Sequence, residues 1–312
     1  MTITQLQYVL AVAEHQNFTL AAEKCFVTQP TLSMQIQKVE EELGVQIFDR
    51  SKKPIQLTNI GAKIVNQAKN IVNESNRIKD IVDQQKGFVG GEFRLGIIPT
   101  VMPTLLPMFL GHFQKKYPKV QLIIEELNTA EIVARLKNGH LDAAIAATPL
   151  DDDKIKEIVL YYEPFVGYVP GNHPLFAKKE LVPADLNPAE ILLLRDGHCF
   201  RESILNLCKV ADMPDNSFRI ESGSFETLSR LVDEGLGITL LPYLHTLTLN
   251  DAQKAKLRHF SDPKPAREVS LIFPHTELKM HIVDALRNSI SAVIRGAIAF
   301  HDVAIISPKQ KK

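Results

Sequence analysis

Apolar residues recur at helical spacing in the first part of the chain and predict three helices there. The first helix carries its apolar stripe from Leu6 to Ala13 and ends near Asn17. Thr19 is placed to cap a short second helix over residues 20–25. A third helix follows after a turn of two residues, so the pattern predicts a helix-turn-helix.

The third helix is the candidate for reading DNA. Thr28 caps it, its buried stripe runs from Leu32 to Leu43, and Gly44 closes it. At and after its N-terminus it exposes short polar side chains, which suit base edges and phosphates in a DNA major groove. A solvated helix face is the plain alternative for any single one of them. The residues expected to contact DNA from this helix are Gln29, Pro30, Thr31, Ser33, Gln35 and Lys38.

A hairpin wing is predicted after the third helix, over residues 47–58 with its turn at 51–54. Basic side chains at the tip of such a wing are placed to neutralise phosphates. Together with the three helices, the wing makes residues 1–58 a candidate DNA-binding domain. The basic residues of the wing are Arg50, Lys52 and Lys53.

A long linker helix is predicted over residues 59–87, with apolar residues at alternating three- and four-residue steps. A small winged domain cannot bury such a stripe, so we expect a partner helix and therefore a homodimer with two DNA readers. A lone helix packed on the following domain is the alternative. The seam is expected to contain Ile64, Ile71, Ile78 and Val82, with Ala68 and Ser75 between them.

Beyond residue 91 the pattern changes to alternating strands and helices, an order that predicts a parallel sheet covered by helices. The predicted strands are 92–98, 120–125, 141–146, 165–169, 191–194, 237–241 and 270–273. The predicted helices are 99–116, 130–138 and 278–300.

Amino-acid composition indicates the cellular compartment more clearly than the function. Lys and Arg together number 36, as do Asp and Glu, so bulk charge gives no sign of nucleic-acid binding. Three cysteines indicate a reducing compartment. The N-terminus does not resemble a signal peptide, and no apolar run reaches the roughly 18 residues of a membrane span, so we expect a cytoplasmic protein without a membrane partner. The scattered histidines and cysteines predict no metal site, and no cofactor is expected.

Cys199 and Cys208 form the most informative pair in the chain. If the segment between them is a helix, the thiols point to nearly opposite faces and their Cα atoms lie roughly 13 Å apart. A disulfide needs about 4.4–6.8 Å, so this bond can form only if the segment refolds. His198 precedes Cys199 at the predicted helix start, where a thiolate is stabilised. Two unrelated cysteines are the alternative, and Cys25 is interpreted as a packed core thiol.

The segment from Thr28 to Arg50 resembles the winged helix-turn-helix of LysR-type transcriptional regulators. Its motif reads TQPTLSxxIxxVExxLGxxIFxR, with Val39 and Ile47 where leucine is commoner. The resemblance implies an α/β protein with an N-terminal winged helix-turn-helix, a long linker helix and a two-lobed, periplasmic-binding-protein-like effector domain. The expected boundaries are 1–58 for the DNA-binding domain, 59–87 for the linker, 88–165 with 267–302 for lobe I, 166–266 for lobe II with the redox cysteines, and 303–312 for a basic tail.

A second motif, Gly197-His198-Cys199-x-Arg201 with Cys208, resembles the peroxide-sensing members of that family. The resemblance implies that Cys199 senses and Cys208 resolves. Two positions depart from the pattern: Glu202 stands where an aspartate is familiar, and Phe218 replaces a histidine.

A peroxide pocket is therefore expected around Cys199, because only a thiolate reacts readily with peroxide. Thr100 and Thr129, each just after a strand, would lie at the carboxyl edge of the sheet and bind peroxide oxygens. Oxidation would give a sulfenic acid and then a disulfide with Cys208. The side chains that could raise the thiolate fraction are His198, Arg201 and Arg267, and Glu202 completes the expected pocket.

The residues thus predict a redox-switched, DNA-binding regulator that is not an enzyme, and the resemblance implies that it activates antioxidant genes. The family resemblance adds promoter DNA and RNA polymerase as partners, a homotetramer built from two dimers, and a thiol reductant for reset. One alternative is a LysR-type regulator that binds a small anionic or aromatic effector between its lobes. A second alternative, a thiol peroxidase, leaves the DNA reader unexplained.

Overall fold

The computed structural model describes residues 1–85, 89–210, 222–277, 279–298 and 303–308. The chain forms two compact units, Met1–Lys86 and Gly87–Lys312, and each is described by itself. None of the described helices is long and apolar enough to cross a membrane. Phe218 lies outside the described residues.

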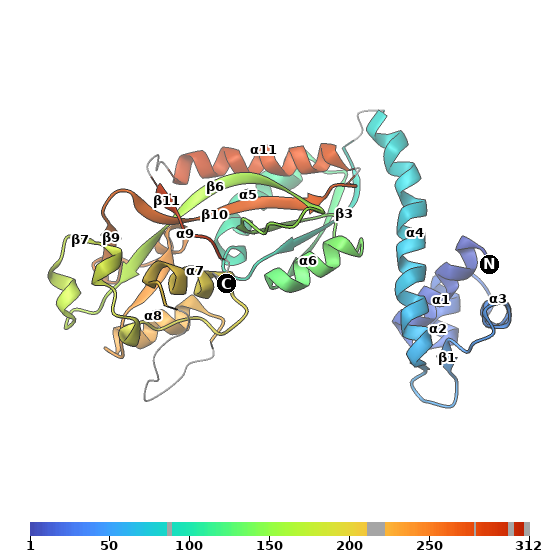
Figure 1. The fold of residues 1–312 in the computed structure, drawn as a ribbon. Coiled ribbons are helices and arrows are strands. Elements are labelled where there is room, and N and C mark those ends of the chain that lie inside the picture. The colour runs from blue at the N-terminus through green and yellow to red at the C-terminus, as the bar shows by residue number, and fades with distance from the viewer. Residues whose placement is uncertain (86–88, 211–221, 278, 299–302, 309–312) are drawn as a thin grey trace. The chain divides into compact units, whose positions relative to one another are not determined.

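The N-terminal unit is a winged helix-turn-helix (Figure 1). The second helix begins earlier than predicted, because Asn17 and not Thr19 caps it: its side-chain oxygen accepts hydrogen bonds from the backbone of Thr19 and Leu20. Strands β1 and β2 pair antiparallel and form the predicted wing. The elements are α1 (Ile3–His15), α2 (Phe18–Lys24), α3 (Gln29–Leu43), β1 (Phe48–Asp49), β2 (Gln56–Leu57) and α4 (Asn59–Gln85).

The first part of the apolar stripe of helix α4 is covered by residues of its own chain. Ala68 is buried against Leu6 of α1, and Ile64 packs on the winged core. The expectation that the winged domain leaves the whole stripe uncovered is therefore wrong for these turns. Further along, Ile71 is 36% and Ile78 is 65% exposed. The side chain of Val82 lies outside the described residues.

The C-terminal unit is built on a mixed sheet whose strand order is β4-β3-β5-β10-β6-β9-β7. The first three strands are parallel, as predicted, but β10 runs antiparallel to both β5 and β6. The expectation of a parallel sheet is thus wrong from β10 to β9, whereas β9 and β7 pair in parallel again. The strands are β3 (Gly91–Ile97), β4 (Val120–Glu126), β5 (Ala143–Thr148), β6 (Ile155–Tyr168), β7 (Glu180–Leu181), β8 (Thr239–Pro242), β9 (Leu257–Phe260), β10 (Lys264–Pro274) and β11 (Val303–Ile305).

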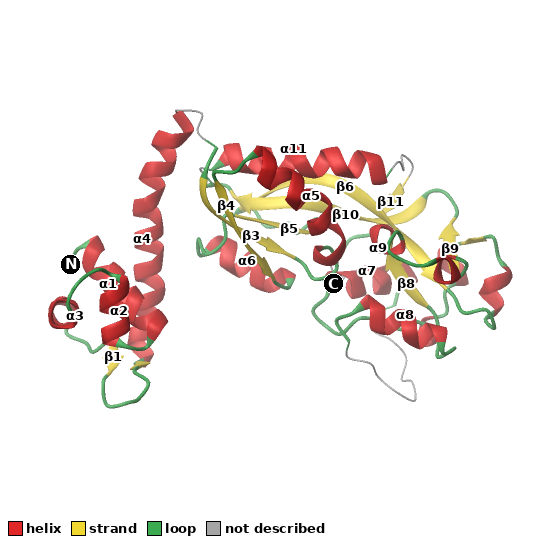
Figure 2. Ribbon diagram, turned by 180° about the vertical axis from the view of Figure 1, so that it is seen from behind, coloured by secondary structure: helices red, strands yellow, loops and turns green. Residues whose placement is uncertain are grey.

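Two separate apolar cores divide this unit into lobes. Helices α5 and α11 pack together on one face of the first lobe, with α6 on the other, and β6 and β10 run through both lobes (Figures 1 and 2). The helices are α5 (Met102–Lys116), α6 (Thr129–Lys137), α7 (Cys199–Cys208), α8 (Phe225–Asp233), α9 (Tyr243–Thr246), α10 (Asp251–Lys254) and α11 (Met280–Ala297), with short 3-10 turns at Pro174–Ala177, Pro183–Asp185 and Pro188–Glu190.

Two predicted segments differ from the structure. Residues 191–194 contribute one bridge, Ile191 to Ile238, and no strand. The expected basic tail begins with a strand, because β11 pairs in parallel with β10, and the side chain of Asn206 donates to the backbone oxygen of Ser307 at 2.8 Å. The C-terminal segment therefore contacts α7, the helix that carries both Cys199 and Cys208.

Candidate functional sites

The candidate DNA-reading surface lies at the start of α3. Gln29, Thr31 and Lys38 are exposed, and Thr28 caps the helix by accepting from the backbone of Thr31. Pro30 occupies the first turn and is also exposed.

Two predicted members of this surface form hydrogen bonds with other side chains of the N-terminal unit. Gln35 is half-buried, and its side-chain oxygen accepts from Gln5 of α1 at 3.0 Å. Ser33 is also half-buried and accepts from Arg50 at 3.5 Å. The described contacts therefore favour Gln29 over Gln35 as a base reader.

Arg50 anchors the wing to the third helix. Its guanidinium lies 2.9 Å from the buried Glu40 carboxylate and stacks over the ring of Phe18. Glu40 also accepts from the backbone of Ile47 and Phe48. Sequence reasoning missed Glu40, although its place beside Val39 on the buried face of the helix is a usable signal.

Lys52 and Lys53 are exposed on the wing, where they are available to phosphates. Arg50 is only partly available, since its side chain is 40% exposed and already paired. The three basic residues of the wing therefore differ: Arg50 is held by Glu40, whereas Lys52 and Lys53 face solvent.

The Cys199 thiol lies in a narrow space between the two lobes. Thr100 follows β3, Thr129 begins α6, and His198 is the residue before α7. All three line the same space as Cys199, whose side chain is 8% exposed. The empty volume is about 160 Å³ and holds no position wide enough for a water molecule, so the space must widen slightly to admit any ligand. The lining is Ile98, Pro99, Thr100, Asn128, Thr129, Gly197, His198 and Cys199.

Burial is the largest influence on the Cys199 thiol, and it raises the pKa. The Arg267 charge opposes this rise, followed by the Thr129 hydroxyl and the backbone N–H groups of Ala147 and Phe200. The net pKa is nevertheless above that of a free cysteine. In this reduced form the sensing candidate is therefore mainly a protonated thiol that nearby donors are arranged to ionise.

Arg267 is fully buried and held on several sides. Its Nε and Nη2 donate to Glu163 at 2.9 and 2.7 Å, and its Nη1 donates to the Thr100 hydroxyl at 2.8 Å. Nη2 also donates to the Thr100 backbone oxygen, and the guanidinium lies over the ring of Phe200. Sequence reasoning found Arg267 but missed Glu163, which lies directly opposite it on β6.

His198 and Arg201 do not assist the thiol as expected. Burial, and then the charge of Arg195, lower the pKa of His198, so its imidazole is neutral at neutral pH. Arg201 instead pairs with Asp196 at 2.8 Å. The buried Oε2 of Glu202 has no hydrogen-bond partner in the described residues.

Cys208 lies at the far end of α7 and packs against the core of the second lobe, whereas Cys199 belongs to the core of the first. Burial raises the pKa of Cys208 to about 11. Both thiols are free. Cys25 packs on the winged core, as expected, and burial raises its pKa.

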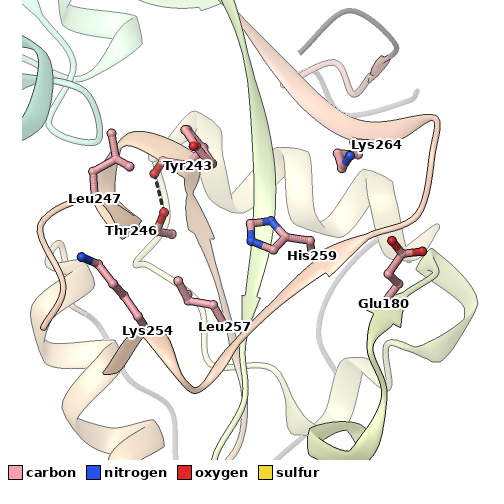
Figure 3. A pocket seen from close by; sticks show the side chains of 8 residues that line it. All are labelled: Glu180, Tyr243, Thr246, Leu247, Lys254, Leu257, His259 and Lys264. Atoms are coloured by element: carbon pink, nitrogen blue, oxygen red, sulfur yellow. Dashed lines mark hydrogen bonds between the residues drawn. The ribbon is translucent and has the colours of Figure 1, made fainter. Parts of the chain in front are cut away.

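A larger, open hollow with an empty volume of about 1260 Å³ lies elsewhere on the second lobe, between α9, α10 and β9 (Figure 3). None of the residues that the sequence singles out lines it. Lys264 there already pairs with Asp262, and the Thr246 hydroxyl is bonded to the Tyr243 backbone. The lining is Glu180, Tyr243, Thr246, Leu247, Lys254, Leu257, His259 and Lys264.

Comparison with known families identifies both units. Residues 3–62 match the family described as bacterial regulatory helix-turn-helix protein, lysR family. Residues 86–295 match the family described as LysR substrate binding domain. The two matches together span most of the chain.

Curated relatives and solved structures agree with these matches. The chain is 35% identical to the DNA-binding transcriptional dual regulator OxyR of Escherichia coli K12, over 88% of this chain and 89% of the relative. It is 34% identical to the hydrogen peroxide-inducible genes activator of Pectobacterium carotovorum, over 88% of this chain and 90% of the relative.

Two solved structures are also similar. A full-length OxyR mutant from Pseudomonas aeruginosa has a TM-score of 0.75 at 34% identity, covering 93% of this chain and 98% of that one. An H2O2-bound OxyR mutant from Corynebacterium glutamicum has a TM-score of 0.63 at 28% identity, covering 95% and 93%.

Proposed function

We propose that this chain, which belongs to the LysR family of bacterial transcriptional regulators, binds promoter DNA and senses hydrogen peroxide through Cys199. The observation that carries the proposal is the buried thiol in a narrow interlobe space, with hydroxyl and backbone donors around it. The names of the relatives, which describe activators of hydrogen peroxide-inducible genes, support the same reading.

Thiolate attack on peroxide is the first proposed step. The Cys199 sulfur bonds to one oxygen, the O–O bond breaks, and a sulfenic acid and hydroxide result. Besides the Cys199 thiol, the buried Thr129 hydroxyl has no hydrogen-bond partner among the described residues, so it is available to a peroxide oxygen. The Thr100 hydroxyl accepts from Arg267, which leaves its own hydrogen for the second oxygen.

Condensation of the two thiols is the second proposed step. The Cys208 sulfur attacks the Cys199 sulfenic acid, a disulfide forms, and water leaves. Both cysteines lie on one unbroken helix, α7, so their Cα atoms are roughly 13 Å apart. The helix must therefore unwind, which breaks the Asn206 contact with Ser307 and the packing of Phe200, Ile204 and Leu207. A thiol reductant would reset the helix.

The proposed oligomeric state and the contact with RNA polymerase rest on the resemblance to the family. A dimer through α4, a tetramer of two dimers, and contact with RNA polymerase belong to this proposal. Refolding of α7 would change how effector units pair and so the spacing of the DNA readers.

A small-molecule effector is the second candidate within the same fold. Peroxide is favoured, because the space at Cys199 has an empty volume of only about 160 Å³ and has to widen least for the smallest ligand. A thiol peroxidase is disfavoured because the winged helix serves DNA and adds nothing to peroxide turnover.

Mass spectrometry tests the central claim. After one equivalent of H2O2, digestion should yield a linked peptide that joins Cys199 to Cys208. Cys199→Ser should lose the peroxide response entirely, whereas a protein governed by a cleft effector would keep its ligand response in that variant. Peroxide turnover sustained by a thiol reductant would instead favour the enzyme.

The rate of Cys199 oxidation should rise with pH. Because burial holds the pKa of the thiol above that of a free cysteine, only a small fraction is thiolate at neutral pH. Below the pKa, each pH unit should increase the thiolate fraction about tenfold. Thiol loss followed from pH 6 to 9 checks this expectation, and a flat profile would contradict it.

Substitutions on the third helix and on the wing should affect DNA binding differently, the first through sequence specificity and the second through overall affinity. Gln29→Ala should weaken binding to the preferred site by about 1–3 kcal/mol and relax sequence choice, because an exposed amide on α3 is suited to a base edge. Lys53→Ala should weaken binding to all sequences and reduce the salt slope by about one per reader. Titrations on specific and random duplexes at several salt concentrations distinguish them. Equal salt slopes in both variants would contradict the assignment.

A further inference from the structure

We propose that Glu163 is a positioning residue that sets how strongly Arg267 stabilises the Cys199 thiolate. The inference deepens the proposed function, since it rests on Cys199 as the sensing thiol. Glu163 would act in two opposed ways: it fixes the guanidinium beside the pocket, and it neutralises part of the charge that the thiolate would otherwise receive.

The geometry carries the positioning role. Glu163 and Arg267 are directly opposite each other on the antiparallel strands β6 and β10, and each side chain is 1% exposed. The Glu163 Oε2 accepts from both Nε and Nη2 of Arg267, so one edge of the guanidinium is fixed. The remaining Nη1 is directed to the hydroxyl of Thr100, which lines the Cys199 space.

Glu163 is itself held in place. Its Oε1 accepts from the backbone of Leu244 at the start of α9, and its Oε2 is used by Arg267. A carboxylate with both oxygens occupied cannot rotate away without leaving a buried donor unsatisfied. The orientation of Arg267 is thus determined by the sheet and by α9, not by the flexible arginine side chain.

The charges of the two side chains support the second role, in which Glu163 neutralises part of the Arg267 charge. Arg267 lowers the pKa of Cys199, and Glu163 interacts with the same guanidinium. The negative charge of Glu163 is also felt nearby, because it adds to the burial that raises the pKa of Tyr161. His198, which lines the same space as the thiol, is neutral at neutral pH. Arg267 is therefore the charge that lowers the pKa of Cys199, and Glu163 opposes this effect through the guanidinium that it shares a salt bridge with.

The test measures the ionisation of Cys199 directly. In a Cys25→Ser, Cys208→Ser background, thiolate absorbance against pH reports Cys199 and needs no peroxide. Glu163→Gln keeps a hydrogen-bond acceptor and removes the charge, so the midpoint should fall by about one pH unit. The rate with H2O2 at neutral pH should then rise only about threefold, because nucleophilicity falls with thiol pKa.

Two further variants show whether Glu163 acts through Arg267. Glu157→Gln, on the same strand, is the matched control and should leave the midpoint unchanged. In the double variant Glu163→Gln, Arg267→Gln the midpoint should rise above that of the parent, because the nearby cation is gone. This variant leaves no unpaired buried charge, so it can be measured even if Glu163→Gln folds poorly.

The outcomes are distinct. The proposal would be overturned by an unchanged midpoint in Glu163→Gln, or by a double variant whose midpoint equals that of the parent. A midpoint in the double variant that is as low as in Glu163→Gln would assign Glu163 to direct repulsion of the thiolate and would also overturn the proposal. If the parent thiol ionises as expected but never reacts with H2O2, the proposed function fails while this inference stands.

Discussion

Amides of residues 200–208 should lose hydrogen-exchange protection when the reduced protein is oxidised by one equivalent of H2O2. In the reduced form these residues belong to one helix, and a disulfide between its ends exceeds reach by several ångströms. The bond can therefore form only after the helix unwinds. Exchange should accelerate about a hundredfold, equivalent to about 3 kcal/mol of local stability.

Single-cysteine variants assign this change to the disulfide. Cys208→Ser should still gain one oxygen at Cys199 but keep α7 protected, because the sulfenic acid has no thiol to condense with. Cys25→Ser is the matched control and should behave as the parent, since Cys25 lies in the other unit. Full protection of α7 in a sample with a proven Cys199–Cys208 link would rule out the unwinding mechanism.

Local patterns account for most of what the sequence predicts correctly. Helix α3 begins after Thr28 and ends at Gly44, because a hydroxyl cap and a left-handed glycine are signals carried by single residues. The parallel strands β3, β4 and β5 follow from the alternation of strands and helices. Thr100 and Thr129 meet Cys199 because strands that run in parallel end at one edge.

Long-range pairings account for what the sequence leaves open. Glu163 and Arg267 are 104 residues apart, and no local pattern marks a buried cross-strand ion pair. The C-terminal strand β11 escapes prediction because its partner, β10, lies far away along the chain and its own apolar run is short. The sequence places Glu40 on the buried face of its helix, but no local pattern shows that Arg50 of the wing pairs with it.

Replacing Ile78 with aspartate should dissociate the proposed dimer. Within its own chain Ile78 is 65% exposed, so the substitution costs the single chain little. In a symmetric α4 seam each chain contributes the same residue, and a buried, unpaired carboxylate should cost at least about 3 kcal/mol. The dimer dissociation constant would rise more than about a hundredfold.

Sedimentation at micromolar concentration checks the expected shift to monomer. Asn66→Asp is the matched control, because it adds the same charge at an exposed position of α4 on the face turned away from the seam. Ile71 is a less clear site, since it is only 36% exposed and lies next to Val72, which packs on α1. The monomer should also bind a two-half-site duplex more weakly, because each chain then reads one half-site alone. An unchanged oligomer in Ile78→Asp would exclude this stretch of α4 as the interface and place the partner contact on another surface.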